Sequence, residues 1–373
     1  MKIAFLATKL TKHDAISNYS VDILKKLSGS HKVDLYTFAN QAEIPSKAGQ
    51  YNYTSIKDHN LKSVFFSTTK IYQLARKLEK YDLLILCGPD VPVLVSAHLA
   101  RHFNPDLKLI WDFHGLTPIR YIYFKDKLLT CIRRTVSFQS MKTSDLILVR
   151  SESIKREIEQ YVNSAERLKI SVIPIGINLN HFTNVDAEEI RKKHNLYSHF
   201  VLLYVGRLAP SKQVDFLIKA LPNLNQDFIL VIVGGGIEKE NLENLAASLK
   251  VRDRVIFAGR VSDEDLPKYY ASSDAFVTAS LHEGFCVPII ESFACGKPAV
   301  VPDRTAMPEV VDGGGFIYDG SIEDFLLKLK NFKNRVILEE LNIKVNQVIK
   351  KYDISKVSEE YLKIIEKFMD ESK

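Results

Sequence analysis

Two glutamates, Glu283 and Glu291, lie eight positions apart in the sequence. The segment that contains them is the part of the chain whose residues most clearly indicate a ligand-binding site. The apolar run Asp274–Thr278 before them predicts a strand, and the apolar spacing after Val287 predicts a helix. Glu283 would therefore lie on a strand-to-helix turn, where free backbone N–H groups favour an anion. A carboxylate accepts two hydrogen bonds at once, which suits the vicinal hydroxyls of a sugar. The segment therefore predicts a site for a nucleotide-linked sugar.

A pair of cations follows another predicted strand. Phe200–Val205 leads into a turn that carries Arg207 and Lys212, five positions apart. A departing nucleoside diphosphate carries about two negative charges, which must be stabilised as the glycosidic bond breaks. Arg grips phosphate oxygens with two N–H groups, and Lys supplies a point charge. Both residues are therefore candidates for binding and stabilising a diphosphate.

The run from Glu283 to Pro298, which ends in Ala-Cys-Gly-Lys-Pro, resembles a known family, and supporting matches extend from Gly206 to about Gly315. The chain resembles the retaining glycosyltransferases of family 4 (glycosyltransferase group 1), which carry the EX7E motif. The resemblance implies an α/β protein of the GT-B fold, with two doubly wound Rossmann-like domains facing across a cleft. It also implies a nucleotide-diphosphate-sugar donor, a glycan, lipid-linked or small-molecule acceptor, and retention of anomeric configuration. The sequence has no credible carboxylate pair for a divalent cation, so we expect neither metal nor other cofactor.

The resemblance also assigns roles to individual residues. It places the transferred sugar near a histidine of the loop after a first-domain strand, which makes His114 a candidate catalytic residue with Arg207, Lys212 and Glu283. Ile16 and Ser17 are expected on the acceptor side, beside His114. The donor site that it implies comprises Gly206, Arg207, Lys212, Gly234, Arg260, Val261, Glu283, Gly284, Phe285, Cys286, Val287 and Glu291.

Other segments leave alternatives open. Gly234-Gly235-Gly236 is not a dinucleotide fingerprint, and a tight turn explains the run at least as well as contact with a ligand. Asp263-Glu264-Asp265 has the form of a metal-binding Asp-x-Asp motif. Ser262 before it and an apolar helix after it instead favour a helix cap.

Three departures from the family pattern concern the site. The loop after the first strand, Lys9–Tyr19, has no glycine, although the family usually has a glycine-rich loop there. Cys286 stands where the family commonly has a second glycine, and Ile175 where it commonly has Asn. The glycine-free loop is expected to alter the acceptor site and the approach of the backbone to the ligand. Neither Cys286 nor Ile175 removes a charged group, so we expect these two to tune the activity and not to abolish it.

Alternating strands and amphipathic helices predict parallel βαβ units throughout. We expect a first domain over residues 1–172 with a returning helix at about 354–373, a hinge at 173–185, and a donor domain over 186–353. First-domain strands are predicted at Lys2–Thr8, Lys32–Phe38, Asp82–Cys87, Lys108–Phe113, Asp145–Val149 and Ile170–Ile173, and helices at Ala15–Ser28, Val64–Glu79, Val91–Phe103, Tyr123–Met141 and Ser153–Val162. Second-domain strands are predicted at Phe200–Val205, Phe228–Val233, Arg254–Phe257, Asp274–Thr278, Ala299–Val301 and Gly315–Tyr318.

Composition is that of a globular enzyme, with 46% apolar and 26% charged residues in 373. The four cysteines have neither metal nor disulfide spacing, which favours a reducing compartment, so we expect a cytoplasmic protein. Residues 1–175 hold 26 Lys and Arg against 16 Asp and Glu, whereas residues 176–373 hold 25 against 29. The basic half is a candidate for contact with the inner face of an anionic membrane, and its segment Tyr121–Arg134 would make that contact. The alternative is that this segment is an ordinary domain helix. Nucleic acid is not an expected partner.

Three other functions compete with glycosyl transfer. A non-hydrolysing nucleotide-sugar epimerase has the same architecture, but its set of active-site acids is not apparent here. An NAD(P)-dependent oxidoreductase needs a G-x-G-x-x-G after its first strand, which this chain lacks. A two-domain binding protein without catalysis is the third, and the absence of a signal peptide disfavours it.

Overall fold

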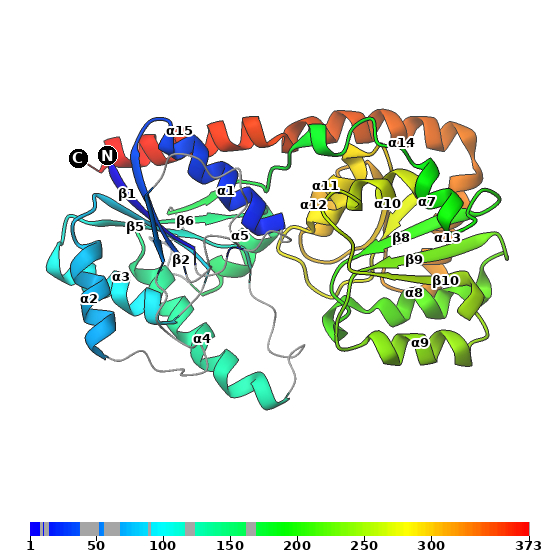
Figure 1. The fold of residues 1–373 in the computed structure, drawn as a ribbon, viewed down its shortest axis with the longest axis horizontal. Coiled ribbons are helices and arrows are strands. Elements are labelled where there is room, and N and C mark those ends of the chain that lie inside the picture. Colours follow the sequence, from blue (N-terminus) through cyan, green and yellow to red (C-terminus); the bar gives the residue numbers. More distant parts are fainter. Residues whose placement is uncertain are drawn as a thin grey trace. The chain divides into compact units, whose positions relative to one another are not determined.

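The computed structural model describes residues 1–7, 10, 15–37, 52–55, 68–88, 91–115, 124–161 and 169–372. The chain divides into two compact units: unit 1 is Met1–Gly176 with Ile354–Lys373, and unit 2 is Ile177–Asp353. Each unit is built on its own sheet (Figure 1). The two chain segments that join the units run side by side, since Ile177 forms a parallel bridge with Asp353.

Unit 1 contains a parallel seven-stranded sheet of order β3-β2-β1-β4-β5-β6-β7. Its central strands are continuous apolar runs because helices cover both faces of a doubly wound parallel sheet. All five residues of β4, for example, are buried. The strands are β1 (Lys2–Ala7), β2 (Lys32–Thr37), β3 (Asn52–Ser55), β4 (Leu83–Cys87), β5 (Lys108–Asp112), β6 (Leu146–Val149) and β7 (Ile170–Val172).

Two features of unit 1 differ from the prediction or extend it. Strand β3 was not predicted; it pairs with β2 in the register Asp34↔Asn52 and lies at the edge of the sheet. The returning helix α15 (Ile354–Glu371) packs against α1 through its buried side, which includes Val357, Tyr361 and Ile365 (Figure 1). The other helices of unit 1 are α1 (Ala15–Ser28), α2 (Thr68–Leu78), α3 (Val91–Phe103), α4 (Phe124–Thr143) and α5 (Glu152–Glu159).

Unit 2 contains a parallel six-stranded sheet of order β10-β9-β8-β11-β12-β13. All six residues of β9 are buried, as its unbroken apolar sequence predicts. The strands are β8 (Phe200–Val205), β9 (Phe228–Val233), β10 (Val255–Gly259), β11 (Ala275–Val277), β12 (Ala299–Pro302) and β13 (Gly315–Tyr318). The helices are α7 (Glu188–Lys193), α8 (Val214–Ala220), α9 (Lys239–Ser248), α10 (Leu266–Ser272), α11 (Val287–Ala294), α12 (Met307–Val311), α13 (Ile322–Lys330) and α14 (Arg335–Val348).

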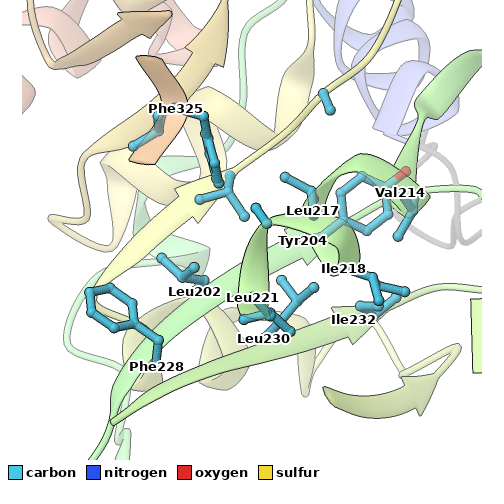
Figure 2. Packing of buried hydrophobic residues seen from close by; sticks show 14 of the residues in the cluster. Leu202, Tyr204, Val214, Leu217, Ile218, Leu221, Phe228, Leu230, Ile232 and Phe325 are labelled. Atoms are coloured by element: carbon cyan, nitrogen blue, oxygen red, sulfur yellow. The ribbon is translucent and has the colours of Figure 1, made fainter. Parts of the chain in front are cut away.

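The core of unit 2 fixes the strands whose ends carry the candidate site. Leu202 and Tyr204 of β8 and Leu230 of β9 belong to the same core cluster as Leu217 and Ile218 of α8 (Figure 2). All five are buried, with at most 2% of each side chain exposed. This packing holds β8 and β9 rigidly in the sheet, so the loops at their carboxyl ends start from fixed positions.

Candidate functional site

The sheet of unit 2 changes its direction of winding between β8 and β11. From β8 the chain adds β9 and β10 on one side, whereas from β11 it adds β12 and β13 on the other. The loops that follow these two neighbouring strands therefore lead away from each other, and ligands of doubly wound sheets bind at such a point. The loop after β8 carries Arg207 and Lys212, and the loop after β11 carries Glu283.

The structure brings together two of the predicted residues from these loops. Nζ of Lys212 donates to Oε1 of Glu283 at 2.5 Å, although the residues are 71 positions apart. Their side chains are 16% and 17% exposed. The backbone N–H of Leu281 also donates to the carbonyl of Ser211 at 2.8 Å, which joins the two loops. A carboxylate and an ammonium group thus lie together at the switch point, within reach of solvent.

The remaining predicted cations of unit 2 are exposed. Arg207 lies on the loop that also carries Lys212, and its carbonyl accepts a hydrogen bond from the hydroxyl of Tyr204 at 3.0 Å. Arg260 directly follows β10. Neither arginine forms an ion pair with any residue that the structure describes. Both guanidinium groups are therefore available to an anionic ligand.

The glycine run after β9 has a structural reason. A Cβ on Gly234 would lie 1.9 Å from the carbonyl oxygen of Gly206, and one on Gly236 would lie 2.2 Å from that of Leu208. At Gly235, by contrast, the nearest atom would be Cγ of Arg260 at 3.7 Å, an ordinary contact. The loops after β8 and β9 touch backbone to backbone, so Gly234 and Gly236 are needed for packing whatever their role toward a ligand.

The helix that carries the second glutamate starts from a strained residue. Cys286, the N-cap of α11, has φ of 74° and ψ of 66°, in the left-handed region that favours the glycine usual in the family. Phe285 beside it is buried and packs edge-to-face on Tyr352, with ring centroids 5.5 Å apart. Val287 opens the helix and is also buried. The turn is thus held firmly by its apolar side chains.

Glu291 is more deeply placed than the sequence suggests. Its side chain is 7% exposed, and its Oε2 accepts a hydrogen bond from the hydroxyl of Tyr270 at 2.6 Å. Burial raises the pKa of Glu291 to about 7, against the opposing effect of the Tyr270 hydrogen bond. The carboxyl group is therefore divided between its charged and neutral forms near neutral pH.

Three residues at the switch point were not predicted from the sequence. The hydroxyl of Thr305 accepts a hydrogen bond from the backbone N–H of Glu283 at 3.0 Å. The guanidinium Nη1 of Arg304 donates to Oε1 of Gln213 at 2.9 Å. Thr305 and Gln213 have positive φ values of 50° and 46°, and strained residues of this kind cluster at functional sites. The one available signal was that Arg304 and Thr305 follow β12, the neighbour of β11.

Unit 1 contains a second polar group at the carboxyl ends of its strands. His114 follows β5 and is 11% exposed. Its Nδ1 accepts a hydrogen bond from Nε of Arg150 at 3.2 Å, and its Nε2 lies 3.3 Å from the sulfur of Cys87. Because an arginine N–H only donates, Nδ1 carries no proton and the ring is neutral. Burial agrees with this, since it lowers the pKa of His114 to about 4.

Arg150 is held by a buried ion pair with Asp112, whose side chains are 0% and 1% exposed. Arg150 also donates to the hydroxyl of Tyr19 at 2.9 Å, and Asp112 accepts from the hydroxyl of Tyr361 at 3.1 Å. Asp112 is thereby linked to α15, which lies far along the chain. No feature of the sequence around Arg150 marks it as a partner of His114.

Cys87, Asp112 and His114 have one potential ligand atom each, all within 4.8 Å of one another, and form the one cluster with metal-ligand spacing in the described part of the chain. The guanidinium of Arg150 contacts both Asp112 and His114. It already supplies the positive charge that a metal ion would bring, so the trio fits a buried network better than a cation site.

The Asp-x-Asp segment also has local partners. Asp265 is the N-cap residue of α10, and its carboxylate accepts from the hydroxyl of Ser262 at 3.0 Å. It also pairs with Lys268 at 2.9 Å. The carbonyl of Asp263 bonds with the ring of His181. Asp265 makes no side-chain capping hydrogen bond to α10, whereas the hydroxyl of Ser262 accepts from the backbone N–H of Asp265 at 3.1 Å.

Several predicted features lie partly or wholly outside the described residues. Ser17 is buried and Ile16 partly buried in the first turn of α1, while the glycine-free loop before them is described at Leu10 only. In the segment Tyr121–Arg134, the side chains are outside the described set except that of Cys131, which is exposed. Among the helices that the structure describes, none is both long and apolar enough to cross a bilayer.

Two family models match the chain. The model of group 1 glycosyl transferases matches residues 186–347, and the model of glycosyltransferase family 4 matches residues 16–181. An uncharacterised glycosyltransferase from Methanocaldococcus jannaschii is 33% identical over 183 residues, which is 47% of this chain and 47% of that protein. A GDP-mannose-dependent alpha-(1-6)-phosphatidylinositol monomannoside mannosyltransferase from Mycolicibacterium smegmatis is 25% identical over 330 residues, covering 84% of each protein.

The fold is also that of known structures. The crystal structure of HepE from Anabaena in complex with UDP-glucose has a TM-score of 0.80 to this chain at 19% identity, over 98% of this chain and 100% of HepE. The expected two-domain α/β architecture is thus confirmed. This likeness shows the GT-B fold, and the two family models, which match residues 16–181 and 186–347, show that the chain belongs to the family 4, or group 1, glycosyltransferases.

Proposed function

We propose that the protein transfers a hexose from a nucleotide-diphosphate-sugar to a hydroxyl acceptor, with retention of anomeric configuration. The observation that carries the proposal is the Lys212–Glu283 pair at the switch point, in the loops that also carry Arg207. Lys212 and Arg207 would stabilise the charge that develops on the leaving diphosphate. Glu283 would accept hydrogen bonds from the hydroxyls of the sugar.

The nucleotide is proposed to extend from this pair along the strand ends of unit 2. Arg260 and Val261 would lie beside the nucleobase, and Glu291 would accept from the ribose hydroxyls once its carboxyl group is charged. Gly206, Gly234, Gly284 and the backbone of Phe285 to Val287 would approach the phosphates and the sugar. The burial of Glu291 implies that nucleotide binding depends on pH near neutrality.

In unit 1, His114 is proposed to orient the transferred sugar. Its neutral ring and lowered pKa argue against a role in proton transfer at neutral pH. With no base required, the leaving phosphate itself would assist the acceptor hydroxyl, which is compatible with retention. Cationic side chains at the diphosphate also offer charge stabilisation of the kind that a metal ion supplies in other enzymes, so we expect transfer to continue in EDTA.

A direct assay tests the proposal. The protein would be incubated with UDP-glucose, GDP-mannose and other labelled nucleotide-sugars, and release of the nucleoside diphosphate would be measured. Arg207→Ala and Lys212→Ala should each lower turnover by about 10²-fold or more. Lys219→Ala is a matched control, because that exposed lysine pairs with Asp215 on α8. Near-normal turnover in both loop variants would remove these cations from the mechanism.

The acceptor is proposed to be a glycan or a lipid-linked glycan at an anionic surface. The excess of basic residues in positions 1–175 supports it, as does the phosphatidylinositol mannoside named for the Mycolicibacterium relative. Sedimentation with phosphatidylglycerol-containing vesicles at low salt tests the surface contact. Failure to bind them would leave a soluble acceptor. NMR of the product tests retention, and a β-linked product from an α-linked donor would refute it.

A further inference from the structure

Arg304 is a cation at the switch point without an acidic partner. Its guanidinium donates to the side-chain oxygen of Gln213 at 2.9 Å, and it forms no ion pair with any described residue. The side chain is only partly exposed. A guanidinium stays charged at any physiological pH and has five N–H donors, of which the amide oxygen of Gln213 takes one. Arg304 therefore retains both its charge and free donors.

The position of Arg304 is fixed on two sides. Gly320 has φ of 98°, and a Cβ there would lie 2.9 Å from Nη2 of Arg304, so the glycine leaves the space that the guanidinium occupies. On the other side Gln213 holds Nη1. Both partners belong to strand-end loops of unit 2, after β13 and β8. The guanidinium is thus held at the same edge of the sheet as the candidate diphosphate site.

Arg304 is also joined to the Lys212–Glu283 pair through its chain neighbours. Gln213, its hydrogen-bond partner, directly follows Lys212 in the sequence. Thr305, the residue after Arg304, accepts the backbone N–H of Glu283. Gln213 thus connects Arg304 to Lys212, and Thr305 connects it to Glu283.

The charges explain what this cation would do. A nucleoside diphosphate carries about two negative charges beside its ester linkages. Arg207 and Lys212 provide two positive charges, but Glu283 neutralises one of them through its ion pair with Lys212. Arg304 restores the balance to two positive charges. Without it, the site would be one charge short for a leaving diphosphate.

We propose that Arg304 is a third cation of the donor site, which binds the diphosphate through its free N–H groups while Gln213 and Gly320 hold it in place. The inference rests on the proposed function, since it names a further binding residue at the same site. It predicts that Arg304 recognises the phosphates and has no part in recognising the nucleoside.

Isothermal titration with UDP, GDP and the nucleosides uridine and guanosine tests this, because only the first two carry phosphate. Arg304→Gln should weaken binding of the preferred diphosphate by about tenfold or more and leave binding of its nucleoside unchanged. Arg304→Lys, which keeps the charge, should recover most of the loss. Arg304→Met, which also removes the charge, replaces Arg304→Gln if that variant does not fold. Lys219→Gln controls for removal of one exposed charge from unit 2, since the side chain of Lys219 is 49% exposed.

The outcomes separate the two proposals. Wild-type protein that binds neither diphosphate would overturn the proposed function and, with it, the role of Arg304. Wild-type protein that binds a diphosphate, with unchanged affinity in Arg304→Gln, would overturn the role of Arg304 alone. So would an equal loss for diphosphate and nucleoside, which would mean that the substitution had distorted the whole site.

Discussion

The buried pair of Arg150 and Asp112 gives the sharpest test of what holds unit 1 together. Asp112→Asn keeps the size of the side chain but removes its charge, so the guanidinium of Arg150 would be left charged in an interior where it is 0% exposed. Breaking a buried pair in this way costs about 3–5 kcal/mol. Tyr19, Ile173 and His114 still accept hydrogen bonds from Arg150. We therefore expect a loss near the lower limit, about 3 kcal/mol of unfolding free energy.

The chain has a natural probe for this measurement. Trp111 is its one tryptophan, is fully buried and belongs to β5 of unit 1. Its fluorescence during urea unfolding therefore reports on unit 1 separately from unit 2. With a denaturant slope of about 2 kcal/mol per molar, a loss of about 3 kcal/mol lowers the urea midpoint by about 1.5 M.

Two further variants make the result interpretable. Arg76→Gln breaks an arginine–carboxylate pair on the surface of the same unit, where the Arg76 side chain is 50% exposed, and should cost less than about 1 kcal/mol. Arg150→Met combined with Asp112→Leu removes both buried charges and should recover much of the stability. If Asp112→Asn shifted the urea midpoint no more than Arg76→Gln, the ion pair of Arg150 and Asp112 would contribute less to the free energy of unfolding than its burial implies.

Three more predictions follow from the two sites. Gly234→Ala should lower the melting temperature sharply, because its Cβ would lie 1.9 Å from a backbone oxygen, whereas Gly235→Ala, with 3.7 Å to the nearest atom, should not. Burial raises the pKa of Glu291 from 4.5 to about 7. The stability that its neutral form provides is therefore complete below pH 4.5 and is lost as the pH rises through 7. In calorimetry, Glu291→Gln should raise the stability of the protein at about pH 8 and have little effect at about pH 5. Because the pKa of His114 is lowered to about 4, the turnover of wild type and of His114→Gln should depend on pH in the same way between about pH 6 and 8. An inflection in this range that only the wild type shows would contradict a neutral His114.

The sequence located most of the fold because its elements are marked by local patterns. Runs such as Phe228–Val233 are apolar throughout, as strands with both faces covered must be, and they lie where they were predicted. The exception is β3, Asn52–Ser55, which has almost no apolar content. It is a strand because its backbone pairs with β2 at the edge of the sheet, and edge strands need no apolar pattern.

At the candidate site, the sequence alone determined which loops carry the chemistry. Arg207, Lys212 and Glu283 could be found because each follows a recognisable strand, and a parallel sheet brings the carboxyl ends of its strands to one edge. Tertiary structure decided the contacts among them. Lys212 meets Glu283 across 71 positions, and Arg150 reaches His114 across 36. Such contacts depend on strand order and side-chain packing, which leave no periodic trace in the sequence, and so does the burial that shifts the pKa of Glu291.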